Sequence, residues 1–132
     1  MRTINKIIIH CSATPEGRNV TVKDIDGWHR NRGFDKIGYH HVIYLDGSIH
    51  TGRAEEIIGA HTAGHNASSI GICYIGGVDT SMKPKDTRTP QQKTALRNLI
   101  KDLQKKYPGA TVHGHNEFSA KACPSFNVKT EL

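Results

Sequence analysis

Three consecutive isoleucines near the start of the chain restrict its fold more than any other feature. Ile7, Ile8 and Ile9 form an unbroken β-branched run, and small polar turn formers begin at Ser12. A short apolar run bounded by turn residues predicts a buried strand from Lys6 to His10. Such a strand has to be covered by other parts of the chain, and His10 would lie at its C-terminal end.

Two later stretches predict helices. From Thr21, which can cap a helix, apolar residues recur at helical spacing until the stop signal at Gly33. Thr89-Pro90 predicts the start of a second helix, with proline at its first position, that runs to about Tyr107. The second helix carries a core-facing stripe of apolar residues, namely Ala95, Leu96, Leu99, Ile100 and Leu103.

The remaining segments predict further strands. Asp46-Gly47 is a strong hairpin signal and would join strands over 39–45 and 48–51. Residues 70–75 and 111–115 predict two more strands, 59–69 a long surface loop, and 78–88 an exposed connection. The order of elements predicts an α/β fold, a single domain over residues 1–132 with a central mixed β-sheet flanked by helices.

Composition limits the partners and the compartment. The net charge of +6 favours polyanions, but Lys and Arg are scattered and aromatic residues make up only 6%, which argues against a nucleic-acid partner. Three cysteines form no disulfide framework and favour a reduced compartment or a metal. The first residues lack the apolar core of a signal peptide, and no stretch predicts a membrane span. We expect a monomer that is synthesised in the cytoplasm.

Nine histidines exceed what packing requires. We expect His29, His50 and His65 to lie on solvated surfaces. His10 differs because it ends a buried strand, where a polar side chain needs a hydrogen-bond partner or a metal. His61 lies in the long loop, where it would either line a cleft and contact substrate or be solvated.

A zinc site can be assembled from His10 and residues near the end of the chain. His113 and His115 lie two apart on a predicted strand, so either could project beside His10. Cys123 follows, and two imidazoles with one thiolate form an open catalytic zinc site. A buried inert thiol is the alternative for Cys123 and suits Cys73 better, while Cys11 should point to the opposite face of its strand from His10.

Four segments carry a resemblance to a known family, namely 9–14 (IHCSAT), 38–40 (GYH), 66–71 and 121–124 (KACP). Together and in this order they resemble the zinc-dependent N-acetylmuramoyl-L-alanine amidases, which include phage amidase-type lysozymes (endolysins) and peptidoglycan recognition proteins. The likeness runs from Lys6 to about Phe126. It implies a zinc cleft on one face of the sheet.

The resemblance also implies specific roles. The family spacing, with a histidine ligand eight positions before the cysteine, selects His115 and gives His10, His115 and Cys123 as the ligands of one Zn²⁺. Tyr39 and Lys121 match the catalytic tyrosine and lysine. The implied reaction is hydrolysis of the amide between N-acetylmuramic acid and L-alanine in bacterial peptidoglycan, so the enzyme would reach the cell wall after lysis or by another delivery route.

Two other functions are compatible with these residues. A non-catalytic peptidoglycan-binding module would use the same cleft without cleaving the bond, although the presence of Cys123 favours catalysis. A cysteine peptidase would use Cys123 or Cys11 as a nucleophile together with a histidine.

Overall fold

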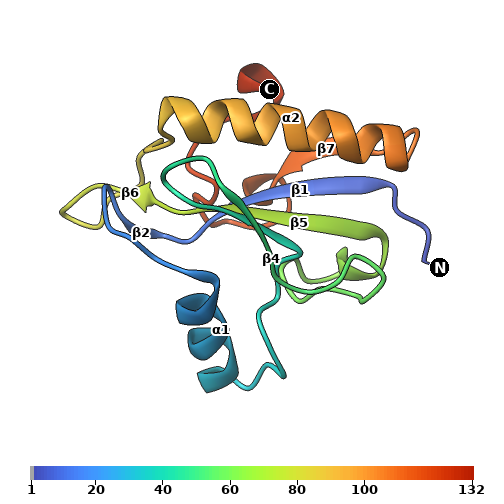
Figure 1. The fold of residues 1–132 in the computed structure, drawn as a ribbon, viewed down its shortest axis with the longest axis horizontal. Helices are drawn as coiled ribbons and strands as arrows, with labels where there is room; N and C mark the ends of the chain where they lie inside the picture. Colours follow the sequence, from blue (N-terminus) through green and yellow to red (C-terminus); the bar gives the residue numbers. More distant parts are fainter. Residues whose placement is uncertain (1) are drawn as a thin grey trace.

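The computed structural model describes residues 2–132 and contains one five-stranded sheet (Figure 1). Its strand order is β4-β3-β5-β1-β7. The strands are β1 (Lys6–Cys11), β3 (His41–Ile43), β4 (Ile49–Thr51), β5 (Ser69–Tyr74) and β7 (Thr111–Gly114). All neighbours pair in parallel except β3 and β4, which form the predicted antiparallel hairpin. The predicted mixed sheet is therefore confirmed.

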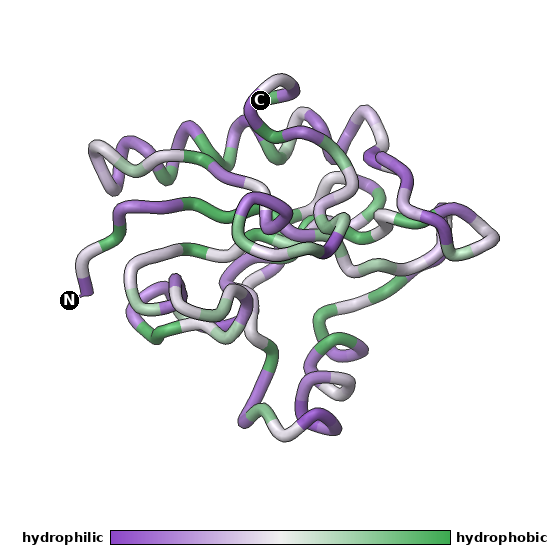
Figure 2. Tube along the Cα trace, turned by 180° about the vertical axis from the view of Figure 1, so that it is seen from behind, coloured by the Kyte–Doolittle hydropathy of each residue, from purple (hydrophilic) through white to green (hydrophobic). Residues whose placement is uncertain are grey.

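The isoleucine run forms β1 and lies between β5 and β7. Ile7 pairs with Ile70 and Ile9 pairs with Ile72 in β5, and all four side chains are inaccessible to solvent. Figure 2 shows the hydrophobic stretches gathered along these inner strands. Parallel strands buried on both faces carry continuous apolar runs, which explains why no alternation is visible in this segment.

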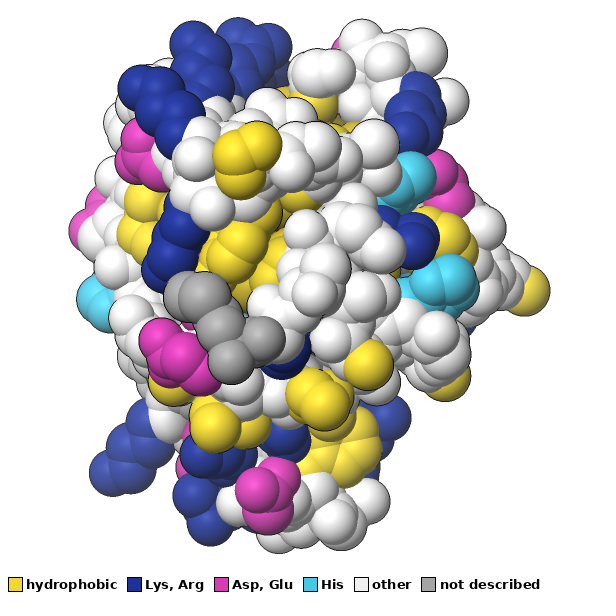
Figure 3. All heavy atoms as spheres, turned by 90° about the vertical axis from the view of Figure 1, so that its right-hand side faces the viewer, with side chains coloured by type: hydrophobic (Ala, Val, Ile, Leu, Met, Phe, Trp, Pro, Cys, Tyr) yellow, Lys and Arg dark blue, Asp and Glu magenta, His cyan; other side chains and the backbone are white. Residues whose placement is uncertain are grey.

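Three helices accompany the sheet, namely α1 (Val22–Asn31), α2 (Pro90–Lys106) and the short α3 (Val128–Glu131). Thr21 and Thr89 cap α1 and α2 as predicted. Each cap is completed three residues later by Asp24 or Gln92, whose side chain accepts the backbone N–H of the capping threonine. Lys105 and Lys106 end α2, where Figure 3 shows basic side chains gathered and where cations complement the helix dipole.

The two faces of the sheet are covered differently. The larger core cluster packs α2, through residues such as Leu96 and Leu103, against Ile7 and Ile9. A smaller cluster on the other face includes Ile25 of α1. Figure 1 shows α2 lying along the sheet and α1 projecting from the opposite side. Because α1 covers only part of its face, an open cleft lies beside it, lined by Ile25 and His29 of α1 and by Cys11 at the end of β1.

Some boundaries differ from the prediction. The segment 78–88 was predicted to be exposed, but Thr87 and Arg88 are buried. Thr87 accepts the backbone N–H of Gly77 through its hydroxyl, next to a two-stranded sheet formed by β2 (Thr14–Pro15) and β6 (Gly77–Val78). A turn of 3-10 helix, η1 (Asn66–Ser68), interrupts the long loop. None of the helices within residues 2–132 has the length and apolar character that crossing a membrane requires.

Candidate metal centre and active-site cleft

His10 lies at the C-terminal end of β1, as predicted, with its side chain almost completely buried. Burial lowers the pKa of the imidazole well below 6.5, and the neighbouring His61 and His115 add to the effect. The ring is therefore neutral at physiological pH. A neutral imidazole is the form that binds transition metals.

His115 and Cys123 approach His10 from the end of the chain. β7 ends at Gly114, and the following 3-10 turn, η2 (His115–Glu117), places the His115 ring 4.6 Å from the His10 ring between centroids. The Cys123 Sγ lies 3.9 Å from Nδ1 of His10. It also accepts the backbone N–H of Cys11 at 3.2 Å, a contact that stabilises negative charge on sulfur.

The three side chains fit a zinc ion. One donor atom from each of His10, His115 and Cys123 lies within 4.8 Å of the other two, and no other group of three such residues within 2–132 meets this criterion. With ordinary Zn–N and Zn–S bond lengths, tetrahedral geometry places nitrogen and sulfur ligands about 3.5 Å apart. The observed 3.9 Å between Nδ1 and Sγ is close to this separation.

The strand register separates His115 from His113. His113 pairs with Ile8, which lies two residues before His10 in β1. The ring nitrogens of His113 form hydrogen bonds with Thr111 and Glu117. His115 follows two residues later and so lies beside His10. Of the two histidines, His115 is therefore the one whose ring lies beside His10.

An open cleft on the α1 side of the sheet is lined by His115 and Cys123, and the buried His10 lies next to them. The two halves of the cleft meet at shared lining residues, namely His29, Arg32, Tyr39, His115 and Lys121. The Tyr39 ring lies 5.0 Å from the His10 ring between centroids, and burial raises the pKa of its phenol well above 10. Lys121 is exposed at the rim. Tyr39 therefore offers a protonated hydroxyl, and Lys121 offers a mobile positive charge.

The prediction of a solvated His29 is wrong. His29 lies one helical turn after Ile25 and shares its buried face, a spacing that could have revealed its position. Its Nδ1 accepts the backbone N–H of Gly38 at 2.9 Å, and its ring lies beside Tyr39. His50 and His65 are only partly exposed, because they stack on Tyr44 and Phe118.

The other two cysteines lie where the sequence placed them. Cys73 is completely buried in the smaller cluster, and burial raises the pKa of its thiol. The Cys11 side chain belongs to the α2-side cluster, opposite to His10. Its backbone nevertheless contributes to the site through the hydrogen bond to Cys123.

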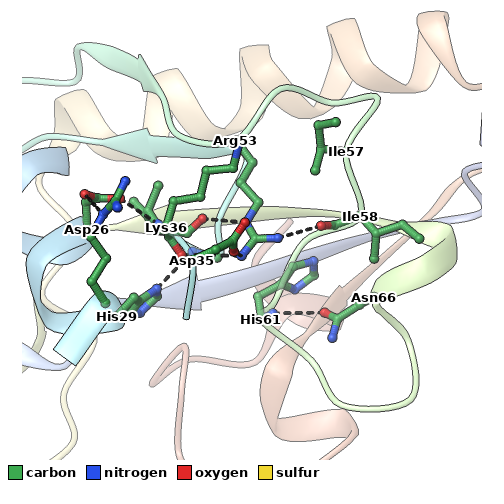
Figure 4. Close-up of polar contacts among 12 residues, drawn as sticks. Asp26, His29, Asp35, Lys36, Arg53, Ile57, Ile58, His61 and Asn66 are labelled. Atoms are coloured by element: carbon green, nitrogen blue, oxygen red, sulfur yellow. Dashed lines mark hydrogen bonds and ion pairs between the residues drawn. The ribbon is translucent and has the colours of Figure 1, made fainter. Parts of the chain in front are cut away.

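Two polar anchors hold the loop that forms one wall of the cleft. Asn66 accepts the backbone N–H groups of His61 and Thr62 through its Oδ1, both at 2.9 Å, and so stabilises the loop. Arg53, which the sequence did not single out, donates to the carbonyls of Ile37 and Ile58 (Figure 4). Its side chain is 8% exposed, so it ties the loop to the segment before β3 from inside the protein.

Comparison with known proteins identifies the family. The family model described as N-acetylmuramoyl-L-alanine amidase matches residues 1–126. This chain belongs to that amidase family. The endolysin of Escherichia phage T7 is 44% identical over 123 residues, which cover 93% of this chain and 82% of the relative. The endolysin of Klebsiella phage KP32 is 40% identical over 125 residues, or 95% of this chain and 83% of the relative.

Solved structures of family members share the fold. The N-acetylmuramoyl-L-alanine amidase LysC from Clostridium intestinale superimposes with a TM-score of 0.85 at 34% identity. The alignment covers 98% of this chain and 82% of the LysC chain. Drosophila PGRP-LB gives a TM-score of 0.80 at 31% identity, with 94% and 76% covered. This chain therefore shares the fold of these solved structures.

Proposed function

We propose that this protein is a zinc-dependent amidase that hydrolyses the bond between N-acetylmuramic acid and L-alanine in peptidoglycan. The observation that carries the proposal is the convergence of His10, His115 and Cys123, of which the last two line an open cleft, in a chain of the amidase family. Two imidazoles and one thiolate leave a fourth position for water or substrate, as catalytic zinc sites require.

Zinc held there would polarise the scissile carbonyl and lower the pKa of water to roughly 7. The protein's own groups supply the rest. Tyr39 lies next to His10 with its hydroxyl protonated, so it can donate a hydrogen bond to the oxyanion that forms at the carbonyl. Lys121 lines the same cleft and can offer a positive charge or a proton to the departing amine.

The properties of Cys123 argue against it as the nucleophile of a cysteine peptidase. A hydrogen bond with Cys123 lowers the pKa of the Cys11 thiol to about 7, but the Cys11 side chain belongs to the cluster on the α2 side of the sheet, opposite to His10. The neighbouring Cys11 side chain, together with burial, raises the pKa of the Cys123 thiol. A nucleophilic cysteine requires the opposite shift, because the thiolate is the reactive species. A metal cation beside Cys123 would stabilise the thiolate instead, which suits a ligand.

The test combines metal content with product analysis on purified peptidoglycan. We expect one zinc per chain, loss of activity with a chelator, recovery with zinc, and release of new L-alanine amino termini. Cys123→Ser should lose zinc and activity, whereas Cys73→Ser, a cysteine outside the site, should keep both if it folds. Stoichiometric zinc with binding to peptidoglycan but no new termini would indicate the non-catalytic module. Activity that survives complete zinc removal would overturn the proposal.

A further inference from the structure

The two ring nitrogens of His10 face different surroundings. Nδ1 faces the Cys123 sulfur, on the side where a metal would bind. Nε2 lies 2.9 Å from Nδ1 of His61 and 3.3 Å from the Thr62 hydroxyl. A neutral imidazole carries one N–H proton. A hydrogen-bond acceptor near Nε2 holds that proton on Nε2 and leaves the lone pair of Nδ1 free.

The His61 ring is held in one place. An alanine Cβ at Gly71 would lie 2.6 Å from the ring, and one at Gly59 would lie 2.7 Å from it, so the ring occupies space that any larger residue at either position would fill. The backbone N–H of His61 is anchored by Asn66 (Figure 4). A side chain fixed in this way presents its nitrogens at defined points.

The contacts of His61 accommodate the tautomer that carries its proton on Nε2. Its Nε2 lies 3.2 Å from the Ser69 hydroxyl, which can accept a proton from it. With the proton on Nε2, the His61 Nδ1 is an acceptor, and it faces Nε2 of His10. The chain of bonds then runs from His10 through His61 to Ser69, with each imidazole donating from Nε2.

We propose that His61 is a positioning residue. Its Nδ1 accepts a hydrogen bond from the Nε2–H of His10, which keeps the lone pair of the His10 Nδ1 directed at the metal. Metal-binding histidines typically donate their second ring N–H to a partner that fixes orientation and tautomer. Here the partner that accepts this hydrogen bond is the imidazole of His61. The inference rests on the proposed zinc site. It assigns His61 a role different from the substrate contact expected from the sequence, since both of its nitrogens already face protein partners.

Four variants separate this role from simple packing. His61→Leu removes the acceptor, whereas His61→Asn restores an acceptor oxygen near the position of Nδ1. Thr62→Val removes the other acceptor near His10 and should have the smaller effect, because its contact is longer. His65→Leu is the matched control, because His65 lies in the same loop but stacks on Phe118.

Two measurements decide the matter. Chelator competition should show zinc affinity about 10- to 100-fold weaker in His61→Leu, largely recovered in His61→Asn and unchanged in His65→Leu. Nitrogen-15 NMR of the metal-free protein should show His10 protonated on Nε2 in the wild type and as a tautomer mixture in His61→Leu.

Wild-type zinc affinity or an unchanged His10 tautomer in His61→Leu would overturn the inference. If His61→Leu does not fold, Ser69→Ala tests the same bonds, and an unaltered His10 tautomer and zinc affinity there would count against the inference. The two proposals fail separately. A wild type that binds no zinc would refute the metal centre, while the tautomer in metal-free protein still reports on His61.

Discussion

Replacing Gly71 by alanine should disturb the candidate metal centre without changing any of its ligands. The added Cβ would lie 2.6 Å from the His61 ring, whereas carbon atoms in contact are separated by about 3.5 Å, so the ring or the strand must move by roughly 0.9 Å. The strand has little freedom, because Gly71 pairs with Ile8 and both of its backbone polar groups bond to His40. The ring should therefore move.

The expected cost follows from overpacking of a buried site. Such substitutions destabilise a protein by about 1–3 kcal/mol. Displacing His61 also lengthens its 2.9 Å contact with His10, so zinc affinity should fall by about tenfold or more, which corresponds to roughly 1.4 kcal/mol. Urea unfolding of the metal-free protein measures the first effect, and chelator competition measures the second.

Gly27→Ala is the matched control for this experiment. Gly27 lies within α1, and nothing lies within 4 Å of an added Cβ there, so alanine should stabilise the protein by about 0.5–1 kcal/mol and leave zinc affinity unchanged. The steric reasoning is refuted if Gly71→Ala unfolds at the wild-type urea concentration. Lost stability with wild-type zinc affinity would refute the coupling between His61 and His10.

Four further substitutions test the cleft and the residues that support it. Tyr39→Phe and Lys121→Ala should keep zinc, measured by metal analysis, but lower kcat on peptidoglycan by about 10²-fold each; unchanged rates would remove them from the mechanism. Burial alone would raise the pKa of Glu55, but hydrogen bonds from Lys106, Tyr107 and His41 outweigh it and lower the pKa to about 2. Because this pKa lies below the ordinary value of 4.5, the stabilisation is complete above pH 4.5 and is lost as pH falls toward 2. Glu55→Gln should therefore cost on the order of 1 kcal/mol at pH 7, after allowance for solvent screening, and nothing near pH 2, in urea titrations at both pH values. Arg53→Lys cannot satisfy both carbonyls that Arg53 reaches and should destabilise the protein by about 1–3 kcal/mol in the same assay; a wild-type midpoint would contradict this.

The elements of the fold could be predicted because their signals are local. The isoleucine run, the capping threonines and Asp46-Gly47 each act through neighbours within a few residues, and each lies in the predicted element. The strands of the hairpin are shorter than predicted, since Tyr39 and Leu45 lie outside the ladder. Local patterns locate an element but do not fix how far its pairing extends.

The candidate site could be predicted only in part, because it depends on contacts distant in sequence. Residue chemistry selected His10 and Cys123, but only the register of β7 against β1 places His115 rather than His113 beside His10. Arg53 was missed because most of its partners are backbone carbonyls, which leave no pattern in the sequence, and its carboxylate partner Asp35 lies 18 positions away. Clustered carboxylates or histidines indicate a candidate site from the sequence alone, whereas a single arginine does not show that its guanidinium is buried.

The position of β1 between β5 and β7 has a consequence for the protein while it is being made. Lys6 pairs with Thr111, and His10 lies beside Cys123, 113 positions later in the sequence. At about 5–20 residues per second, a ribosome needs roughly 6–23 seconds to pass from His10 to Cys123. A growing chain therefore holds only one of the three candidate metal ligands until His115 and Cys123 have been synthesised. The candidate metal centre can form only after that point, late in the synthesis of this domain.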